Sequence, residues 1–163
     1  MIYSNACGYA IRAVVRLASL RPQGYVLLDE LCEGTDLPRH FVAKIFQKLV
    51  REGVLLSAKG RGGGFALAKP ANEMRLYDIV EVVDGAEHFD RCVVGIEKCS
   101  DTQSCPLHDQ WKPLRQQIKS FLMETTVDQM SDSLLTKYEQ LGKPLPDLQT
   151  QGKPVKLKHG TSD

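Results

Sequence analysis

Hydrophobic residues recur every three or four positions along several stretches of the chain, which is the spacing of amphipathic α-helices. This repeat predicts helices over 4–20, 28–33, 38–52, 76–83 and 107–125, and a last short helix from 127. Two short apolar runs, 54–57 and 65–67, indicate strands on either side of the glycine-rich segment 60–64, which suits a turn. The pattern therefore predicts a mainly α fold with one small β-hairpin.

The helix predicted over 38–52 has one apolar face and one basic face. Its buried stripe is expected to contain Phe41, Val42, Ile45, Phe46, Leu49 and Val50. Its outer face carries Arg39, His40, Lys44 and Lys48. A helix, a short helix, a turn at 34–37, this basic helix and a hairpin follow in the order of a winged helix-turn-helix. We expect the basic helix to enter a major groove of DNA, and Lys59 and Arg61 at the hairpin tip to reach the minor groove.

Charge is divided unevenly along the chain, although the net charge is only +1. Residues 1–72 carry 10 Lys and Arg against 5 Asp and Glu, whereas 73–134 carry 6 against 12. A basic first half suits a polyanion, and nucleic acid is the commonest one. In the first helix, Arg12 and Arg16 are expected together on the polar face.

The composition excludes several other classes of protein. With 163 residues, 42% of them hydrophobic and 25% charged, the chain resembles one soluble domain. No apolar stretch approaches the roughly 18 residues of a membrane span. The N-terminus lacks the basic and then apolar pattern of a signal peptide. We therefore expect a cytoplasmic protein with no membrane partner.

Three of the five cysteines and one histidine lie in or just after 85–105, a segment without hydrophobic periodicity. These candidate metal ligands are Cys92, Cys99, Cys105 and His108. Three thiolates and an imidazole suit an iron–sulfur cluster or zinc. The tight cysteine pair usual in zinc sites is missing, so the wide spacing favours a cluster, with zinc and simple thiols as alternatives. Cys7 and Cys32 lie on or beside apolar faces and are expected to be buried thiols.

The helix predicted over 107–125 has apolar residues at alternating intervals of four and three. These apolar residues form a row along one side of the helix, which we call the seam, and they are Leu107, Trp111, Leu114, Ile118 and Phe121. Heptad spacing of this kind is typical of a helix that pairs with another helix. Pro113 falls inside the pattern and is expected to kink the helix or to mark its true start. From 142 the chain is rich in Lys, Pro and Gly and is expected to be a polar tail.

Three segments together resemble the IscR/NsrR/CymR-type bacterial regulators of the Rrf2 superfamily. They are SNACGYAIR at 4–12, KGRGGGF at 59–65, and the three-cysteine loop with its CPLH sequence and Trp111. The resemblance runs in register to about residue 134 and implies a homodimeric transcription factor with an N-terminal winged helix-turn-helix and a long C-terminal dimerisation helix. The expected divisions are a DNA-binding domain over 1–84, a cluster loop over 85–105, the dimerisation and final helices over 106–140, and a tail over 141–163.

Many members of this family bind an iron–sulfur cluster through the three loop cysteines and a variable fourth ligand. The resemblance assigns His108 to the place of the histidine used by the cluster-biogenesis members. Gly8 stands where nitric-oxide sensors carry an acid, and Gly8 and Arg12 stand where a third scheme uses a glutamate and a histidine. The chain departs from the cluster-biogenesis members at two points. The interval from Cys92 to Cys99 is one residue longer, and Ala43 replaces a glutamate that discriminates between operators.

These features predict one function. We expect a DNA-binding repressor, not an enzyme, that binds a palindromic operator as a homodimer. It would sense iron–sulfur status, or oxidative or nitrosative stress, through a cluster that is 2Fe–2S rather than 4Fe–4S. A cluster-free family member that senses thiol oxidation or a partner protein is the main alternative. A zinc-stabilised interaction module, and a small enzyme with Cys92 or Cys105 as nucleophile and His108 as base, are the others.

Overall fold

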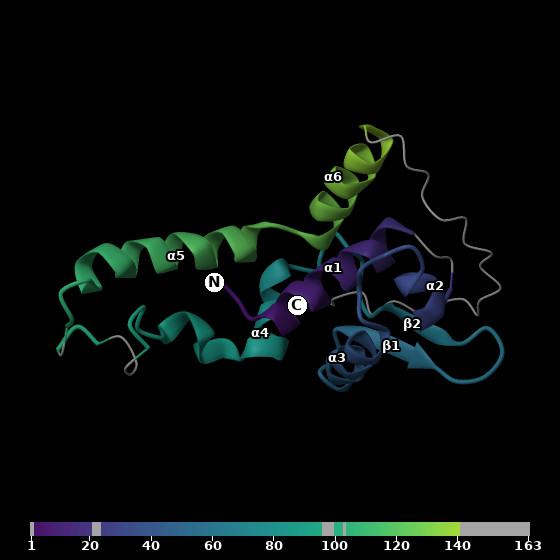
Figure 1. Cartoon of the computed structure of the whole chain (residues 1–163), viewed down its shortest axis with the longest axis horizontal. Helices are drawn as coiled ribbons and strands as arrows, with labels where there is room; N and C mark the ends of the chain where they lie inside the picture. The colour runs from purple at the N-terminus through teal and green to yellow at the C-terminus, as the bar shows by residue number, and fades with distance from the viewer. Residues whose placement is uncertain (1, 21–23, 96–99, 103, 141–163) are drawn as a thin grey trace, which may run out of the picture.

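The computed structural model describes residues 2–20, 24–95, 100–102 and 104–140, so Cys99 and the tail over 141–163 lie outside the described residues. Figure 1 shows the elements in chain order, which are α1 (Asn5–Ser19), α2 (Leu28–Cys32), α3 (Arg39–Arg51), β1 (Leu55–Ala58), β2 (Gly64–Leu67), α4 (Leu76–Asp84), η1 (Ala86–Asp90), α5 (His108–Glu124) and α6 (Val127–Gln140). The predicted mainly α fold with one hairpin is confirmed, and the predicted ends of the helices and strands lie within one residue of the observed ends.

Helix α1 forms the centre of the molecule and packs against α3, α4 and α6. Its first turn is capped by Ser4, whose hydroxyl accepts a hydrogen bond from the backbone N of Cys7 at 3.1 Å. The carboxylate of Asp84 accepts in turn from the backbone N of Ser4 at 2.8 Å, which ties the start of α1 to the end of α4. The largest fully buried side chains of the described residues are Leu17, Leu31, Phe46, Leu49, Leu55, Met74, Ile79 and Leu122.

Arg16 corrects one expectation about α1, because it lies inside the fold and not on the polar face. Its side chain is only 5% exposed, and its Nη2 donates a hydrogen bond to the backbone O of Glu33 at 2.8 Å. Arg12, by contrast, is exposed as predicted and pairs with Asp36 at 2.9 Å. The helical repeat alone cannot show this difference, because the acceptor for Arg16 comes from the far end of α2.

The hairpin is antiparallel and runs in register from the pair Leu55 and Leu67 to the pair Ala58 and Gly64. Val26 adds a single bridge to its outer edge, with two backbone hydrogen bonds to Phe65 at 2.8 and 2.9 Å. The ring of Phe65 lies edge-on to that of Phe46, with centroids 5.1 Å apart. The hairpin is therefore held against α3, which fixes the position of the wing relative to this helix.

The segment 85–105, predicted to be a structureless loop, contains the short 3-10 helix η1. Its Phe89 is buried, at 5% exposure, and stacks on Tyr77 with ring centroids 6.0 Å apart. A single turn of helix is too short to produce a hydrophobic repeat, which is why the sequence pattern gave no sign of it.

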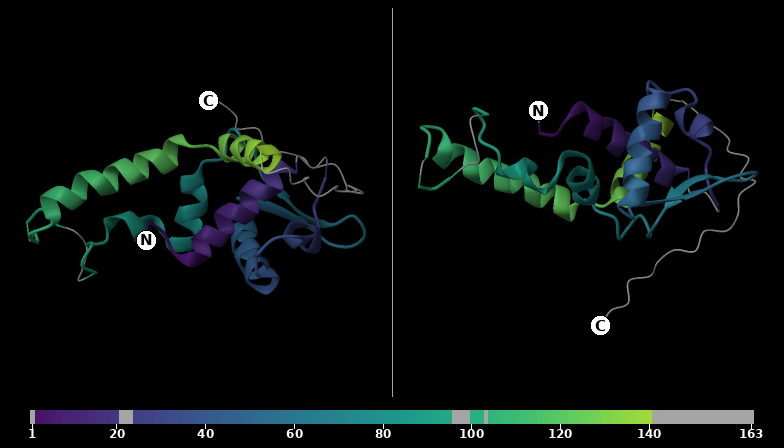
Figure 2. Two further views of the ribbon diagram at one scale, coloured as in Figure 1. Left: turned by 45° about the horizontal axis from the view of Figure 1, so that its top comes forward. Right: turned by 90° about the horizontal axis from the view of Figure 1, so that it is seen from below.

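Helix α5 extends away from the compact part of the chain, as Figures 1 and 2 show, and contacts α4 and η1 at one side. It starts at His108 and continues through Pro113, so the proline does not mark its start. A capping box in which Thr126 and Gln129 exchange hydrogen bonds of 2.9 and 3.1 Å then starts α6, which returns over α1. Within the described ranges, no helix is long and apolar enough to cross a bilayer.

Candidate nucleic-acid interface and cysteine loop

Helix α3 presents most of its predicted cations to solvent. Val42, Ile45, Phe46 and Leu49 form the buried stripe, whereas Phe41, also expected to be buried, is 40% exposed. His40 and Lys44 are exposed on the opposite face. Lys48 is half-buried, and its Nζ donates a hydrogen bond to the backbone O of Val83 at 3.2 Å. Lys48 therefore connects α3 to α4, while the cations nearer the N-terminus of the helix remain open.

Arg39 lies at the first position of α3, and its side chain turns back toward α2. Its guanidinium pairs with the carboxylate of Asp29, and this hydrogen bond lowers the pKa of Asp29 while it raises the pKa of Arg39. Both side chains are more than half exposed, so the pair is open to competition by another anion. A phosphate at this position would meet a guanidinium that is already oriented.

The other two predicted DNA contacts lie on the wing. Lys59 and Arg61 are exposed between β1 and β2, on either side of Gly60. The tip is closed by a hydrogen bond of 2.9 Å from the backbone N of Gly63 to the O of Gly60. Gly60 and Gly62 both have positive φ, at 85° and 72°, which glycine adopts without a steric penalty. This tight turn keeps both cations at the outermost point of the hairpin.

The structure brings together two of the three loop cysteines. The Sγ atoms of Cys92 and Cys105 lie 4.0 Å apart, and both residues are half-buried. Two thiolates bound to one tetrahedral metal through bonds of about 2.3 Å would be separated by about 3.8 Å. The observed separation of the two sulfur atoms is close to this value. Across the described residues no group of three or more His, Cys, Asp or Glu side chains forms a metal site, and Cys99 is outside them.

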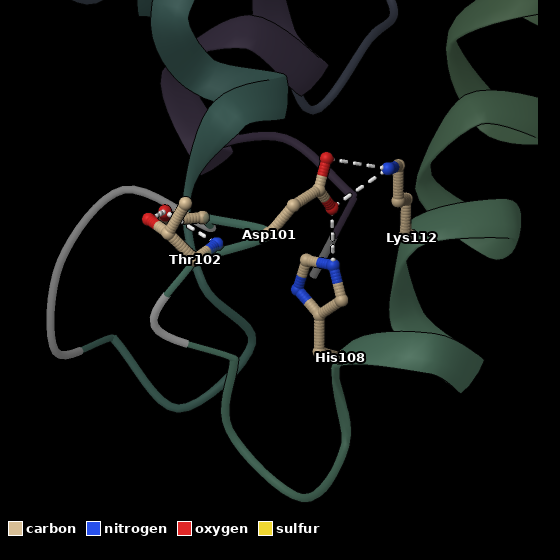
Figure 3. Close-up of polar contacts among 5 residues, drawn as sticks. Asp101, Thr102, His108 and Lys112 are labelled. Carbon is tan, nitrogen blue, oxygen red and sulfur yellow. Dashed lines mark hydrogen bonds and ion pairs between the residues drawn. The ribbon is translucent and has the colours of Figure 1, made fainter.

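His108, the fourth predicted ligand, begins α5 and is only 5% exposed. Its Nε2 lies 2.7 Å from Oδ1 of Asp101, and the same carboxylate accepts two hydrogen bonds from Nζ of Lys112 at 2.7 and 2.9 Å, as Figure 3 shows. These bonds, first from Lys112 and then from His108, lower the pKa of Asp101. In a neutral ring with its proton on Nε2, the lone pair lies on Nδ1, so Asp101 selects the ring nitrogen that can bind a metal.

Asp101 and Lys112 are functional candidates that sequence reasoning missed. Lys112 follows His108 by four residues and so shares its face of α5, which was a usable signal. Asp101 reaches His108 from the loop across a gap in the described residues, and no spacing rule connects them. The ion pair between Asp101 and Lys112 joins the cysteine loop to the second turn of α5.

The α5 seam divides into two sets of residues. Leu107, Leu114 and Phe121 are 46%, 52% and 58% exposed. Trp111 and Ile118 are half-buried and line a cavity of about 250 Å³ that Cys92 also lines. The indole Nε1 of Trp111 donates a hydrogen bond to the backbone O of Arg91 at 3.2 Å, next to Cys92. The first set therefore faces outward from α5, and the second set packs toward the cysteine loop.

Comparison with known proteins finds one family over most of the chain. The family model Rrf2, described as iron-dependent transcriptional regulator, matches residues 3–133. An HTH-type transcriptional regulator described from Aquifex aeolicus is 35% identical over 129 residues, which is 78% of this chain and 89% of that protein. The HTH-type transcriptional regulator IscR of Pectobacterium atrosepticum is 30% identical over 122 residues, or 75% of this chain and 74% of the relative.

Solved structures show the same fold. The structure of CymR, the global cysteine regulator of B. subtilis, gives a TM-score of 0.68 at 19% identity and covers 80% of this chain and 95% of its own. The structure of IscR from T. potens gives a TM-score of 0.64 at 20% identity and covers 87% and 91%. At these identities the likeness shows the fold alone, which is a winged helix.

Proposed function

This chain belongs to the Rrf2 family of transcriptional regulators, which are not enzymes, and we propose that it is a homodimeric, cytoplasmic repressor that binds a palindromic operator. The exposed cations of α3 and of the wing support this proposal. His40 and Lys44 are open to solvent, and Arg39 needs only to exchange Asp29 for a phosphate. Two copies related by a twofold axis would present two such faces to successive major grooves.

DNA binding is tested by comparing the loss of affinity when an arginine on the wing is replaced with the loss when a lysine far from the wing in the sequence is replaced. We expect Arg61→Ala to weaken binding to the chain's own promoter fragment by about 1–3 kcal/mol, because an arginine in a minor groove makes direct contacts. Lys156→Ala, in the C-terminal tail, should have little effect. Fluorescence anisotropy at several salt concentrations measures both variants, and equal losses would contradict the role of the wing.

We further propose that Cys92, Cys99, Cys105 and His108 hold a 2Fe–2S cluster. The observation that carries this proposal is the 4.0 Å separation of the Cys92 and Cys105 sulfur atoms, which fits two thiolates on one metal. The orientation of the His108 ring by Asp101 also fits, because metal-bound histidines usually donate their second ring N–H to a carboxylate. When bound, such a cluster supplies iron whose redox state and stability respond to oxygen or nitric oxide.

The positions of these residues suggest how a signal would reach the DNA-binding unit. Cys92 follows η1, which packs against α4, whereas Cys105 lies three residues before α5 and His108 is the first residue of α5. A cluster bound by residues on both sides of the loop would fix the position of α5 relative to α4, and therefore relative to the recognition helix α3. Loss of the cluster would change the population of dimers able to bind DNA, and a free-energy difference of about 1–3 kcal/mol between the two states is a useful response.

Anaerobic purification tests the cluster. The protein should be coloured and contain about two iron and two sulfide per chain. Cys99→Ala should abolish the visible absorbance, whereas Cys32→Ala, which removes a thiol outside the loop, should leave it unchanged. Colour that survives in the Cys99 variant would show that the ligand assignment is wrong.

The same pair of sulfur atoms also favours a second candidate, a regulator that senses oxidants through a disulfide and holds no cluster. Hydrogen peroxide would take two electrons and two protons from the Cys92 and Cys105 thiols, and one disulfide and two water molecules would form. Peptide mapping without reductant after peroxide treatment measures this bond. Iron-free protein in which the Cys92–Cys105 disulfide forms and changes promoter affinity would favour this candidate over the cluster.

A further inference from the structure

A cavity of about 450 Å³ lies where α6 packs on the second half of α1, beside the turn between α2 and α3. This volume is within the range of small-molecule sites in proteins, which is about 300–1,000 Å³. The cavity is distant in sequence from the cysteine loop, and none of the predicted ligand or DNA-contact residues lines it. Its apolar wall is formed by Ile11, Val15, Leu37 and Met130.

The charged part of the cavity wall is mainly positive. Arg12, Arg16 and Lys137 line it, and Asp36 is the one carboxylate among the lining residues, where it pairs with Arg12 at 2.9 Å. The wall thus combines an apolar surface with an excess of cationic groups, an arrangement that suits a molecule with an apolar body and an anionic head.

Arg16 gives the strongest indication of what the cavity binds. It is 5% exposed, and among the described residues no carboxylate forms an ion pair with it. Its Nη2 donates a hydrogen bond to the backbone O of Glu33, but its buried Nε has no hydrogen-bond partner within the part of the chain that the structure describes. The nearby Cys32 does not supply a negative charge, because burial raises the pKa of its thiol. A buried guanidinium without a counter-ion is costly, and a bound anion removes that cost.

We propose that this cavity is a binding site for a small amphipathic carboxylate, whose head group pairs with Arg16 and whose apolar body packs on Ile11, Val15, Leu37 and Met130. Arginine favours a carboxylate because its planar fork of donors matches the two oxygens. The turn that forms one wall leads directly into α3. A bound carboxylate therefore contacts the segment that positions the recognition helix.

Binding is tested by calorimetry on the full chain with four matched probes. Octanoate carries both the tail and the negative head, octanamide lacks the charge, octylamine reverses it, and sulfate lacks the tail. We expect octanoate to bind at least ten times more tightly than each of the other three. Equal affinity for octanoate and octanamide, or no binding of octanoate, would overturn the proposal.

Variants locate the site. Arg16→Gln should weaken octanoate binding at least tenfold, and Ser133→Trp, at the exposed rim of the cavity, should abolish binding by filling the space. Arg51→Gln, an exposed arginine that does not line the cavity, is the control and should bind as the unaltered chain does. If Arg16→Gln fails to fold, the Ser133 variant decides alone, and unchanged binding there would refute the site.

This inference stands apart from the proposed function, since calorimetry needs neither DNA nor a cluster. A chain that binds octanoate but no promoter would contradict the repressor and leave the cavity assignment intact. A chain that binds its promoter but not octanoate would contradict the cavity assignment and leave the proposed repressor intact.

Discussion

At the scale of single residues, burial separates the cysteines into two chemical classes. Cys7 has no exposed surface, and burial, helped by the charge of Asp84, raises the pKa of its thiol to about 12. A thiol with this pKa is protonated at neutral pH and is a poor nucleophile. Cys92 and Cys105 are half-buried in the loop, and Cys32, which was expected to be buried, is also only half-buried. We therefore expect iodoacetamide to modify the two loop cysteines in metal-free folded protein and to leave Cys7 unmodified.

Peptide mass spectrometry after timed alkylation measures this difference. Alkylation in urea is the control, because unfolding should make Cys7 react as readily as the other thiols. Modification of Cys7 in folded protein at the rate of Cys105 would show that the packing between α1 and α4 opens readily, contrary to the buried position of this thiol.

Asp101 provides a second prediction at this scale. Its carboxylate holds both His108 and Lys112, so Asp101→Ala should leave the His108 ring without the partner of its Nε2. Loss of an outer partner of this kind typically costs about 10–100-fold in metal affinity. We expect the variant to lose its visible absorbance faster when an iron chelator is added. Asp109→Ala, an exposed acid in the first turn of α5, is the matched control, and equal rates would contradict the role of Asp101.

At the scale of elements, the backbone of the wing approaches other backbone closely at Gly63 and Gly64, and the approach at Gly64 is the one that joins the hairpin to the segment around Val26. Gly64 has φ of 133°, and a Cβ added there would lie 2.2 Å from the backbone O of Val26. Gly60 also has positive φ, at 85°, but nothing lies within 4 Å of its added Cβ. We expect Gly64→Ala to lower the free energy of unfolding by about 3 kcal/mol, and Gly60→Ala by about 1 kcal/mol, because only the first adds a clash to the backbone strain.

Urea denaturation followed by circular dichroism measures the two wing variants. Because Val26 bridges to Phe65 next to Gly64, the larger loss should come with a weaker attachment of the hairpin. Equal losses would mean that the backbone conformation alone, and not the contact with Val26, determines the need for glycine at this position.

The elements also show what the sequence could and could not predict. Each predicted helix and strand lies within a residue of its observed bounds, because periodicity and glycine positions report local structure. Arg16, Phe41 and Lys48 were misjudged in burial for one shared reason. Their surroundings are set by partners from other elements, such as the backbone O of Glu33 for Arg16 and that of Val83 for Lys48. A repeat along one helix contains no information about such partners.

The cysteine loop shows the same limit. Its residue types and spacing predicted metal or thiol chemistry, but the approach of Cys92 to Cys105 and the role of Asp101 depend on how η1 and α5 meet. The sequence also gave no sign of the cavity beside Arg16, because its walls come from α1, the turn before α3, and α6. Residues so far apart in the chain become neighbours only through the fold.

At the scale of the whole molecule, α5 leaves a row of large apolar side chains exposed in a single chain. It extends away from the winged helix in Figure 1, and Leu107, which caps it, and Leu114 and Phe121, each seven residues further on, are about half exposed. An exposed row of large apolar residues at heptad spacing marks a helix that pairs with a partner. We therefore expect Phe121→Glu to convert a dimer into a monomer, by weakening association about tenfold or more.

The substitution is informative because Phe121 is already 58% exposed within one chain. Replacing it should change the free energy of unfolding of the monomer by less than about 0.5 kcal/mol, so a loss of dimer would not reflect misfolding. Gln116→Glu adds the same charge to an exposed position two residues after Leu114, on the opposite face of α5, and should leave the dimer intact. Light scattering after size exclusion, at several concentrations, gives the mass of each variant. If Phe121→Glu is still a dimer, the α5 seam is not the interface; if it is a monomer that also loses promoter affinity, pairing through α5 is what joins two recognition helices.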